Sequence, residues 1–208
     1  MITSGGTTEP IDDIRCITNR STGKTASIIA NSLSESGFDV TYLHSRDAIK
    51  AQSSCKHFAF ETFNDLDTLL KAKLSETDYD YVIHAAAVSD YSVAPQPGKI
   101  NSSETELTLT LKRNPKLINE IKKISPNSGL FAFKLTSTMD ESLINAKVSS
   151  LFNLADCNYV IQNDWSDIKN QSYKYRVFDK KLDYKNVESI QSLSAFIFQE
   201  IVQTQEVL

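Results

Sequence analysis

The sequence contains few of the residues from which disulfide frameworks, metal centres and membrane spans are built. Its three cysteines, Cys16, Cys55 and Cys157, form no Cys-x-x-Cys pair, so neither a disulfide framework nor a zinc site is expected. No apolar run approaches the roughly 20 residues that cross a bilayer, and no signal peptide is visible. We therefore expect a cytoplasmic chain that binds no membrane, with Cys16 and Cys157 as small packing residues.

Glycine is also scarce, and the common nucleotide-binding motifs are incomplete. Only six glycines occur, and no Gly-x-Gly exists anywhere in the chain, which argues against a dinucleotide fingerprint. Residues 18–25 (TNRSTGKT) end like a phosphate-binding P-loop, but that motif requires glycine where Thr18 stands. A Tyr-x-x-x-Lys pair is missing too, so ordinary hydride chemistry is disfavoured.

Basic runs and histidine clusters are absent as well. Lys and Arg number 22 against 26 Asp and Glu, a net charge of −4, so the chain is a poor candidate for nucleic-acid binding. The only histidines, His44, His57 and His84, have no metal-ligand spacing. We assign no metal ligands and expect His84 to be a histidine at the edge of the core.

What remains is an ordinary globular composition. Hydrophobic residues make up 40% and charged residues 23% of the 208 residues. This length favours one sizeable core, and no linker or internal repeat divides it. We predict a single domain over residues 1–208.

Strand-like segments alternate with helix-like ones. Strands are predicted at 2–5, 38–43, 80–86, 129–135 and 158–163. The alternation predicts an α/β fold: a Rossmann-like, three-layer, open and mostly parallel sheet with helices on both faces.

Several helix boundaries carry local signals. The first predicted helix covers residues 23–36, with Ser21 or Thr22 as its cap and Gly37 as its end, and the second begins at a Thr62–Asp65 capping box. The third has Asn114 as N-cap and Pro115 as first residue. Two more helices are predicted, one over residues 139–154 and one from near Ser189. Two segments break the pattern: residues 105–112 alternate like a half-exposed antiparallel strand, and residues 172–187 look like a hairpin. Both are predicted to be antiparallel strands added as arms or at a sheet edge.

The long polar loop of residues 2–24 joins the first strand to the first helix. In such a sheet, ligands bind at the carboxyl ends of strands, and helix N-termini attract phosphate. Gly5 permits a close backbone approach, and Ser21 and Gly23 stand where an anion would dock. The alternative is a loop that merely turns the chain.

Residues 84–103 follow the central predicted strand. Small Ala85 and Ala86 allow a flat ligand to approach the backbone, Asp90 can accept bonds from a sugar or base, and Lys99 sits in a Pro/Gly-flanked loop. The alternatives are a capping role for Asp90 and a solvated surface position for Lys99.

A third candidate is the basic patch of residues 112–116 at a predicted helix start, where phosphate could dock. A capped helix with exposed lysines is the alternative. Phe133 and Lys134 end another strand, and Asn163 ends a fourth, so their side chains are expected on the same rim.

Taken together, these segments resemble the phosphopantothenoylcysteine synthetases over nearly the whole chain. The opening ITSGGTTEPIDDIRCITNRSTGK resembles the first block of that family at its Gly, Glu-Pro, Asp, Arg, Asn and Ser-x-Gly positions. The blocks AAAVSDY, GKINSS, RNPKLI, FAFKL and QND follow in the family's order. Six ordered blocks are far more specific than any one of them.

The resemblance implies a ligase of coenzyme A biosynthesis that joins 4′-phosphopantothenate to L-cysteine, using a nucleoside triphosphate and Mg²⁺. It implies that a phosphopantothenoyl-nucleotide forms first, with release of pyrophosphate, and that the cysteine amine then displaces the nucleoside monophosphate. CTP is the expected co-substrate, although the KINSS and FKL wording also resembles relatives that accept ATP.

The resemblance also implies residue roles. Lys99 is the cation of the first step, and Asn19 and Arg15 hold the acyl-nucleotide intermediate. The residues assigned to nucleotide binding, from the loops above and from the resemblance, are Gly5, Ser21, Gly23, Ala85, Ala86, Asp90, Arg113, Asn114, Pro115, Phe133 and Lys147. Leu151 stands where many relatives have a second lysine, so one basic contact is missing.

The resemblance implies a homodimer that forms through the arm segments. Many relatives carry a flavin-dependent decarboxylase half ahead of this region; because this chain starts at the synthetase block, no flavin is expected. Two other functions remain open from the residues. One is an NADP- or flavin-binding oxidoreductase, in which Arg46 would meet a 2′-phosphate, and the other is a non-catalytic nucleotide sensor.

Overall fold

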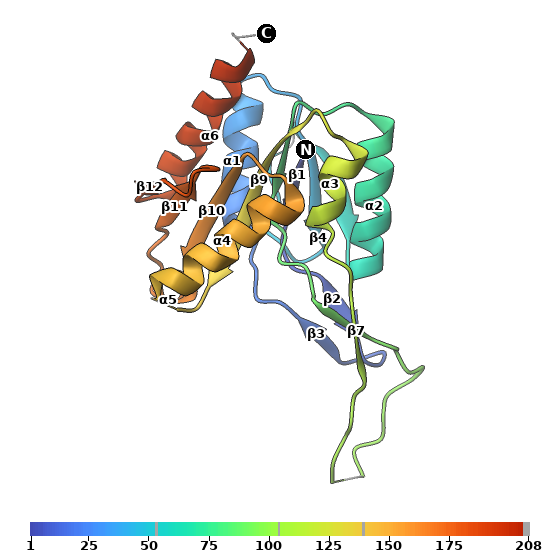
Figure 1. The fold of residues 1–208 in the computed structure, drawn as a ribbon. Helices are drawn as coiled ribbons and strands as arrows, with labels where there is room; N and C mark the ends of the chain where they lie inside the picture. Colours follow the sequence, from blue (N-terminus) through green and yellow to red (C-terminus); the bar gives the residue numbers. More distant parts are fainter. Residues whose placement is uncertain (53, 104, 139, 206–208) are drawn as a thin grey trace.

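The computed structural model describes all residues except 53, 104, 139 and 206–208, and its centre is an eight-stranded sheet (Figure 1). From edge to edge the strands are β12 (Tyr184–Val187), β11 (Tyr175–Phe178), β10 (Tyr159–Asp164), β9 (Gly129–Thr136), β6 (Tyr81–His84), β1 (Ile2–Ser4), β4 (Thr41–Ser45) and β5 (Lys56–Phe60). The strands from β10 to β5 are parallel, and β11 and β12 add an antiparallel hairpin at one edge. The predicted α/β fold is confirmed.

The strand order indicates where a binding site belongs. The chain places β1, β4 and β5 outward in one direction, then returns to place β6, β9 and β10 on the other side of β1. β1 and β6 are therefore neighbours whose connections leave toward opposite sides. Such a switch point leaves a crevice at the carboxyl ends of the two strands, where ligands bind in this class of fold.

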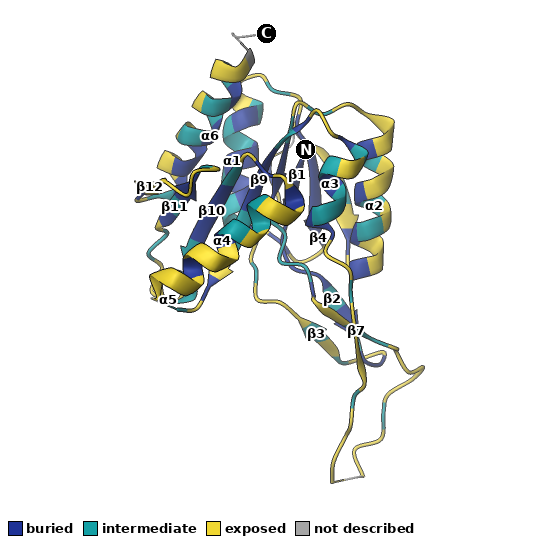
Figure 2. Ribbon diagram, in the orientation of Figure 1, coloured by how far each residue is buried: buried dark blue, intermediate teal, exposed yellow. Residues whose placement is uncertain are grey.

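Helices cover both faces of the sheet (Figures 1 and 2). One face packs against α1 (Lys24–Glu35) and α6 (Ile190–Gln205), and the other against α2 (Phe63–Glu76), α3 (Ile118–Ile124) and α4 (Glu141–Ala155). The short α5 (Trp165–Lys169) follows β10. Each face has its own cluster of buried side chains, mostly aliphatic, and full burial of one such side chain stabilises the fold by about 1.5–3 kcal/mol. The predicted three layers are present.

Local capping signals predict α2 correctly and α1 incorrectly. Thr62 Oγ1 accepts the Asp65 N–H at 3.1 Å, and Asp65 Oδ2 accepts the Thr62 N–H at 2.9 Å, which confirms the capping box. At α1 the N-cap is Gly23, with no side-chain cap. The prediction of Ser21 or Thr22 as the cap is therefore wrong.

The predicted start of the third helix is also wrong. α3 begins at Ile118, after Leu117 as N-cap, and Asn114 caps no helix. Its Nδ2 instead donates to Ser89 O at 3.0 Å and Ser92 Oγ at 2.8 Å. These long-range bonds hold Asn114 against the loop that follows β6, so a local Asn-Pro signal cannot decide its role.

Two small ribbons extend the molecule beyond the sheet. β2 (Thr8–Pro10) pairs with β3 (Cys16–Thr18), and β7 (Tyr91–Val93) pairs with β8 (Leu111–Arg113). Between β7 and β8 the chain forms an arm, residues 94–110, that projects away from the body (Figure 1).

The arm corrects one strand prediction. Only the last two residues of the segment 105–112 enter a strand, and residues 105–110 pair with nothing among the described residues. The strand prediction is wrong for residues 105–110, because an alternating strand needs a partner strand and the described residues offer none there. The segment does lie in a projecting arm, as predicted. The predicted hairpin over 172–187 is confirmed as β11–β12.

The remaining expectations hold in part. The other predicted strands and helices are present within a few residues, although Met139, at the start of the predicted helix 139–154, lies outside the described residues. Cys157 is buried as predicted, but Cys16 is exposed on the thin β2–β3 ribbon, so its prediction as a packing residue is wrong. Among the described helices, none has the length and apolar character that a bilayer span requires.

His84, at the end of β6, is a buried neutral histidine. Thr3 Oγ1 lies 3.0 Å from His84 Nδ1, and the same oxygen accepts the Ala86 N–H at 3.2 Å. The Thr3 hydroxyl proton is therefore available to His84 Nδ1. Burial lowers the pKa of His84 to about 4, which agrees with the expected position at the core edge.

This burial predicts a loss of stability in acid. Unfolded His84 takes up a proton near pH 6.5 while the folded protein resists protonation down to about pH 4, so stability falls between these values. Replacing His84 with Gln should remove about 2–3 kcal/mol of the loss in unfolding free energy between pH 7.5 and pH 4.5. Urea unfolding at the two pH values measures this change in unfolding free energy. Equal losses in the wild type and the variant would contradict the assignment of His84 as a buried neutral histidine.

Candidate functional site

The carboxyl ends of β1 and β6 stay together beyond the sheet. Ala87 N donates to Gly5 O at 2.8 Å, and the N–H groups of Ala85 and Ala86 donate to Thr3 O and Thr3 Oγ1. Because all three alanine N–H groups are used within the chain, a ligand along this segment meets methyl groups and carbonyl oxygens. We call this the β1–β6 junction.

A cavity of about 760 Å³, the larger cavity, opens on the α1 side of this junction. The first loop, the junction alanines and Phe133 line it, together with Trp165 and Tyr173 from the segment beyond β10. Asn19 lies on its wall and donates from Nδ2 to Ala87 O at 3.1 Å. The amide predicted to be catalytic therefore stands directly at the junction.

The N-terminus of α1 forms one wall of the larger cavity, together with Ser21. Gly23, the N-cap, has a φ of 72°, and a Cβ there would lie 2.6 Å from Ser4 Oγ. Gly5, with a φ of 83°, is equally closed, because a Cβ would lie 2.0 Å from Ser45 Oγ. Gly23 has no side chain to cap α1, and the Lys24 N–H donates to Thr22 Oγ1 at 3.4 Å. Among the described residues nothing accepts from the Thr25 and Ala26 N–H groups, so these two remain available to an anion.

Cationic side chains add to this helix terminus. Arg20, Lys24 and Arg46 line the larger cavity. Lys24 Nζ lies 4.5 Å from the centre of the Tyr173 ring, and Arg46 Nε lies 3.3 Å from Glu61 Oε2. A helix N-terminus with nearby cations suits a ligand that carries phosphate.

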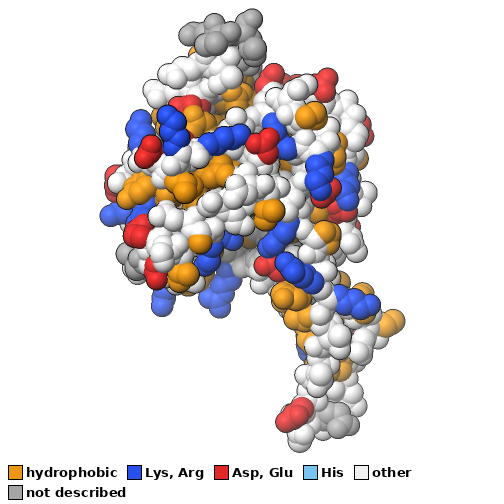
Figure 3. Space-filling view, in the orientation of Figure 1, with side chains coloured by type: hydrophobic (Ala, Val, Ile, Leu, Met, Phe, Trp, Pro, Cys, Tyr) orange, Lys and Arg blue, Asp and Glu red, His pale blue; other side chains and the backbone are white. Residues whose placement is uncertain are grey.

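A second cavity of about 430 Å³, the smaller cavity, opens on the opposite face between α3 and α4. Lys116, Lys134 and Lys147 line it with Asp90, which pairs with Lys116. Burial and then the charges of Lys116 and Lys147 lower the pKa of Lys134. In Figure 3, Lys and Arg side chains gather on this face between α3, α4 and the arm.

The two cavities meet at one place. Ala86, two residues after β6, and Phe133, in β9 where it continues past the end of β6, line both of them. Two ligands bound on opposite faces of the sheet would therefore approach each other across these strand ends. This arrangement suits a reaction that joins two substrates.

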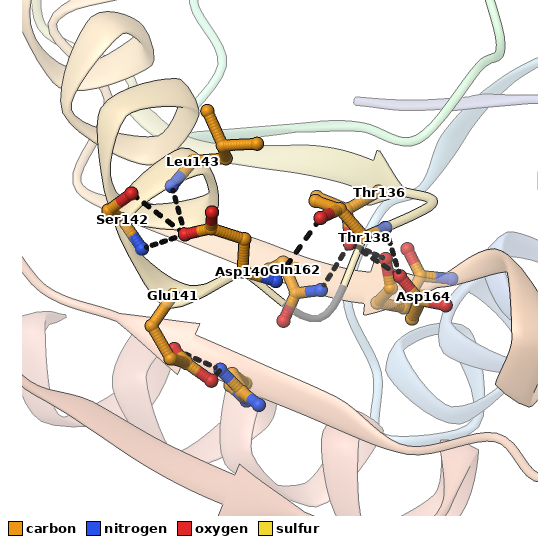
Figure 4. Close-up of polar contacts among 10 residues, drawn as sticks. Thr136, Thr138, Asp140, Glu141, Ser142, Leu143, Gln162 and Asp164 are labelled. Carbon is orange, nitrogen blue, oxygen red and sulfur yellow. Dashed lines mark hydrogen bonds and ion pairs between the residues drawn. The ribbon is translucent and has the colours of Figure 1, made fainter.

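A polar network fixes the connection from β9 to α4 (Figure 4). Asp164 Oδ2 accepts from Thr136 Oγ1 at 2.9 Å and from Thr138 N at 3.2 Å, and Gln162 Nε2 donates to Thr136 Oγ1 at 2.8 Å. Asp140 then caps α4. Because β9 carries Phe133 and Lys134 and α4 carries Lys147, these bonds hold two walls of the smaller cavity in place.

Arg15 and Lys99 lie elsewhere, at the base of the arm. Arg15 Nη2 donates to Ile100 O at 3.3 Å, and Asp12 accepts from Ile100 N at 3.0 Å while pairing with Arg15. Asp13 accepts the Gly98 N–H at 3.1 Å. The loop around Lys99 is thus anchored on both sides to the turn that carries Arg15, and neither residue lines either cavity.

The predicted site residues therefore divide among three places. Those lining the larger cavity are Asn19, Ser21, Gly23 and Ala85; those lining the smaller cavity are Asp90, Pro115 and Lys147; Ala86 and Phe133 line both. Gly5 lines neither cavity and lies next to Gly23. Arg113 and Asn114 line neither cavity: Asn114 braces the loop after β6, and Arg113 is exposed at the end of β8.

Sequence reasoning missed several wall residues of the larger cavity, among them Lys24, Trp165 and Tyr173. They come from α1, α5 and the segment before β11, and only the position of Trp165 directly after β10 could have indicated one of them. No group of three or more His, Cys, Asp or Glu side chains that could hold a metal ion is found in the described part of the chain.

Comparison with known sequences identifies the family. The family model of the DNA/pantothenate metabolism flavoprotein C-terminal domain matches residues 1–204. The chain is 34% identical over 166 residues to the coenzyme A biosynthesis bifunctional protein CoaBC of Methanocaldococcus jannaschii, covering 80% of this chain and 40% of that protein. For CoaBC of Thermococcus kodakarensis the identity is 33% over 147 residues, covering 70% of this chain and 36% of that protein. The chain thus spans less than half the length of these relatives.

Solved structures agree with this result. The DNA/pantothenate metabolism flavoprotein from Streptococcus pneumoniae superposes with a TM-score of 0.87 at 26% identity, covering 98% of this chain and 97% of that one. A Cab2 variant in complex with phosphopantothenate-cysteine shares the fold, with a TM-score of 0.81 at 20% identity, covering 99% of this chain and 85% of that one. The chain therefore belongs to the family of the DNA/pantothenate metabolism flavoprotein C-terminal domain, which confirms its resemblance to the phosphopantothenoylcysteine synthetases.

Proposed function

We propose that the chain is a cytoplasmic phosphopantothenate–cysteine ligase of coenzyme A biosynthesis, with CTP as its co-substrate. The observation that carries the proposal is that two cavities, each lined by Lys or Arg side chains, meet at Ala86 and Phe133. The carboxylates Asp47 and Glu61 also line the larger cavity, and Glu61 pairs with Arg46. Both substrates of the first step bear phosphate, and each needs its own anion site. Family membership and the family resemblance supply the reaction; the two cavities supply a place for each substrate.

The chemistry proceeds in two displacements. A carboxylate oxygen of 4′-phosphopantothenate attacks the α-phosphorus of CTP and releases pyrophosphate, which leaves an acyl-cytidylate. The amine of cysteine then attacks the acyl carbon, CMP leaves, and an amide forms with loss of a proton from the amine. Neither step transfers electrons to or from a cofactor, so the reaction needs no flavin.

The two cavities suit different substrates. The larger cavity has the free N-terminus of α1 beside Ser21 and Gly23, so we place the phosphate of phosphopantothenate there. The smaller cavity combines three lysines with an apolar wall from α4, which suits a triphosphate and a flat base. We place Mg²⁺ with the nucleotide as part of the substrate, bound to phosphate oxygens.

Asn19, Arg15 and Lys99 keep the roles that the resemblance implies. Asn19 stands at the junction where the acyl phosphate would form, and a neutral amide can donate to it without adding charge. Arg15 and Lys99 share the anchored base of the arm. We propose that they approach the reacting groups together, with Lys99 stabilising charge on the transferring phosphoryl group.

Pyrophosphate release tests the function. We expect release to require both 4′-phosphopantothenate and a nucleoside triphosphate, with kcat/KM higher for CTP than for ATP, GTP or UTP. The amide product should appear only after L-cysteine is added. A higher kcat/KM with ATP would overturn the choice of CTP. Nucleotide binding without turnover would indicate a sensor instead of a ligase.

The two half-reactions should separate in variants. Asn19→Asp places a carboxylate beside the acyl phosphate and should slow the cysteine step about tenfold or more, so that acyl-nucleotide accumulates and is detected by mass spectrometry.

Lys99→Gln should instead reduce pyrophosphate release about a hundredfold or more. Asn31→Asp, on α1 away from both cavities, is the matched control. Loss of pyrophosphate release in Asn19→Asp, with no intermediate, would refute this division of roles.

The arm supports a homodimer. Leu107 and Leu111 are about half exposed, at 51% and 44%, and the arm extends away from the body of its own chain. We propose that the arm packs against a second copy. Light scattering should then give twice the 23.3 kDa chain mass, and Leu107→Asp with Leu111→Asp should lower it toward the monomer. A wild-type mass of one chain would disprove the dimer.

A further inference from the structure

More lysines than carboxylates line the smaller cavity, so part of its positive charge is not neutralised. Lys116, Lys134 and Lys147 face it, and the carboxylate that faces them is Asp90, which pairs with Lys116. Lys134 and Lys147 have no ion-pair partner among the residues that the structure describes. His84 also lines this cavity and remains neutral above its pKa of about 4. The charges that line the cavity therefore favour an anion.

Lys134 is the lysine whose position is most constrained. Along β9 the side chains of Leu130 and Ala132 are buried in the α2–α4 core, and Lys134 follows on the same face because strand side chains alternate. It stands where the core ends and the smaller cavity begins, and it is only partly exposed. The pairing of β9 with β10 and the Thr136–Asp164 bond hold this stretch of backbone.

A lysine in this position is unfavourable without an anion. Partial burial penalises its ammonium group, and Lys116 and Lys147 repel it; both effects lower its pKa, whereas Asp90 opposes them. A bound polyphosphate would reverse the repulsion. At the other end of the cavity Leu151 on α4 offers only an apolar surface and no charge.

We propose that Lys134 binds the nucleotide phosphates and supplies, from strand β9, the positive charge that Leu151 does not supply from α4. The inference rests on the proposed function, since it assigns the smaller cavity to the nucleoside triphosphate. Lys134 is then a residue that determines specificity, because Lys134 and Lys147 together supply the positive charge that favours a triphosphate over a monophosphate.

Calorimetric titration with CTP and with CMP, in buffer containing Mg²⁺, tests the proposal directly. Lys134→Met should weaken CTP binding about tenfold to a hundredfold, the usual value of a hydrogen bond to a charged group, and CMP binding much less. Lys134→Arg should stay close to wild type. Lys123→Met removes an exposed lysine of α3 outside both cavities and should bind both nucleotides as wild type does.

A rescue variant distinguishes charge supply from a structural role. Adding Leu151→Lys to Lys134→Met should recover most of the lost CTP affinity, because the cation returns to the same cavity from α4. A merely structural effect of Lys134→Met would not be rescued, and that result would overturn the proposal. Equal CTP affinity in wild type and Lys134→Met would also overturn it.

A protonation readout gives a second check. Because the pKa of Lys134 is lowered in the free protein, CTP binding in alkaline buffer should take up protons, visible as a dependence of the binding heat on buffer ionisation. Lys134→Met should reduce this uptake; no change would contradict the assignment. If the wild-type protein binds neither CTP nor ATP, the proposed function itself fails, whereas tight wild-type binding with an unaffected variant removes only Lys134.

Discussion

The site depends on the contact between the ends of β1 and β6. The Ala87–Gly5 hydrogen bond and the two alanine N–H bonds to Thr3 carry strand-like pairing past the end of the sheet. The loop after β1 is thereby directed to one face and the loop after β6 to the other. Ala86, within this junction, lines both cavities, so the junction lies where the two cavities meet.

Separation of the cavities has a chemical consequence. In the reaction that we propose, both substrates of the first step carry phosphate and repel one another, and the repulsion grows as water is excluded. Placing one beside the free N-terminus of α1 and the other among the lysines around Lys134 balances each negative charge locally. Only the uncharged wall of Ala86 and Phe133 lies between them. The reacting carboxylate and α-phosphorus are thus expected to meet where the chain carries little charge of its own.

The parts of the fold that sequence predicts are those decided by neighbouring residues. The Thr62–Asp65 capping box lies within one turn, so its signal and its structure coincide. Asn114 carries an equally good local signal, yet its amide bonds to Ser89 and Ser92, more than twenty positions away. The segment 105–112 fails for the same kind of reason. Its pattern requires a partner strand, and which strand is available is not a property of the segment.

The site follows the same distinction. Asp90, in the loop after β6, and Phe133, in the second half of β9, are predictable because parallel strands bring their carboxyl ends to one edge. The charge balance of a cavity cannot be predicted in the same way, because it sums contributions from elements that are distant in the sequence. Leu151 taken alone suggests a weakened nucleotide site, whereas Lys134, on another element lining the same cavity, offsets it under our proposal. A missing contact on one helix therefore says little about binding until the charges around the whole cavity are known.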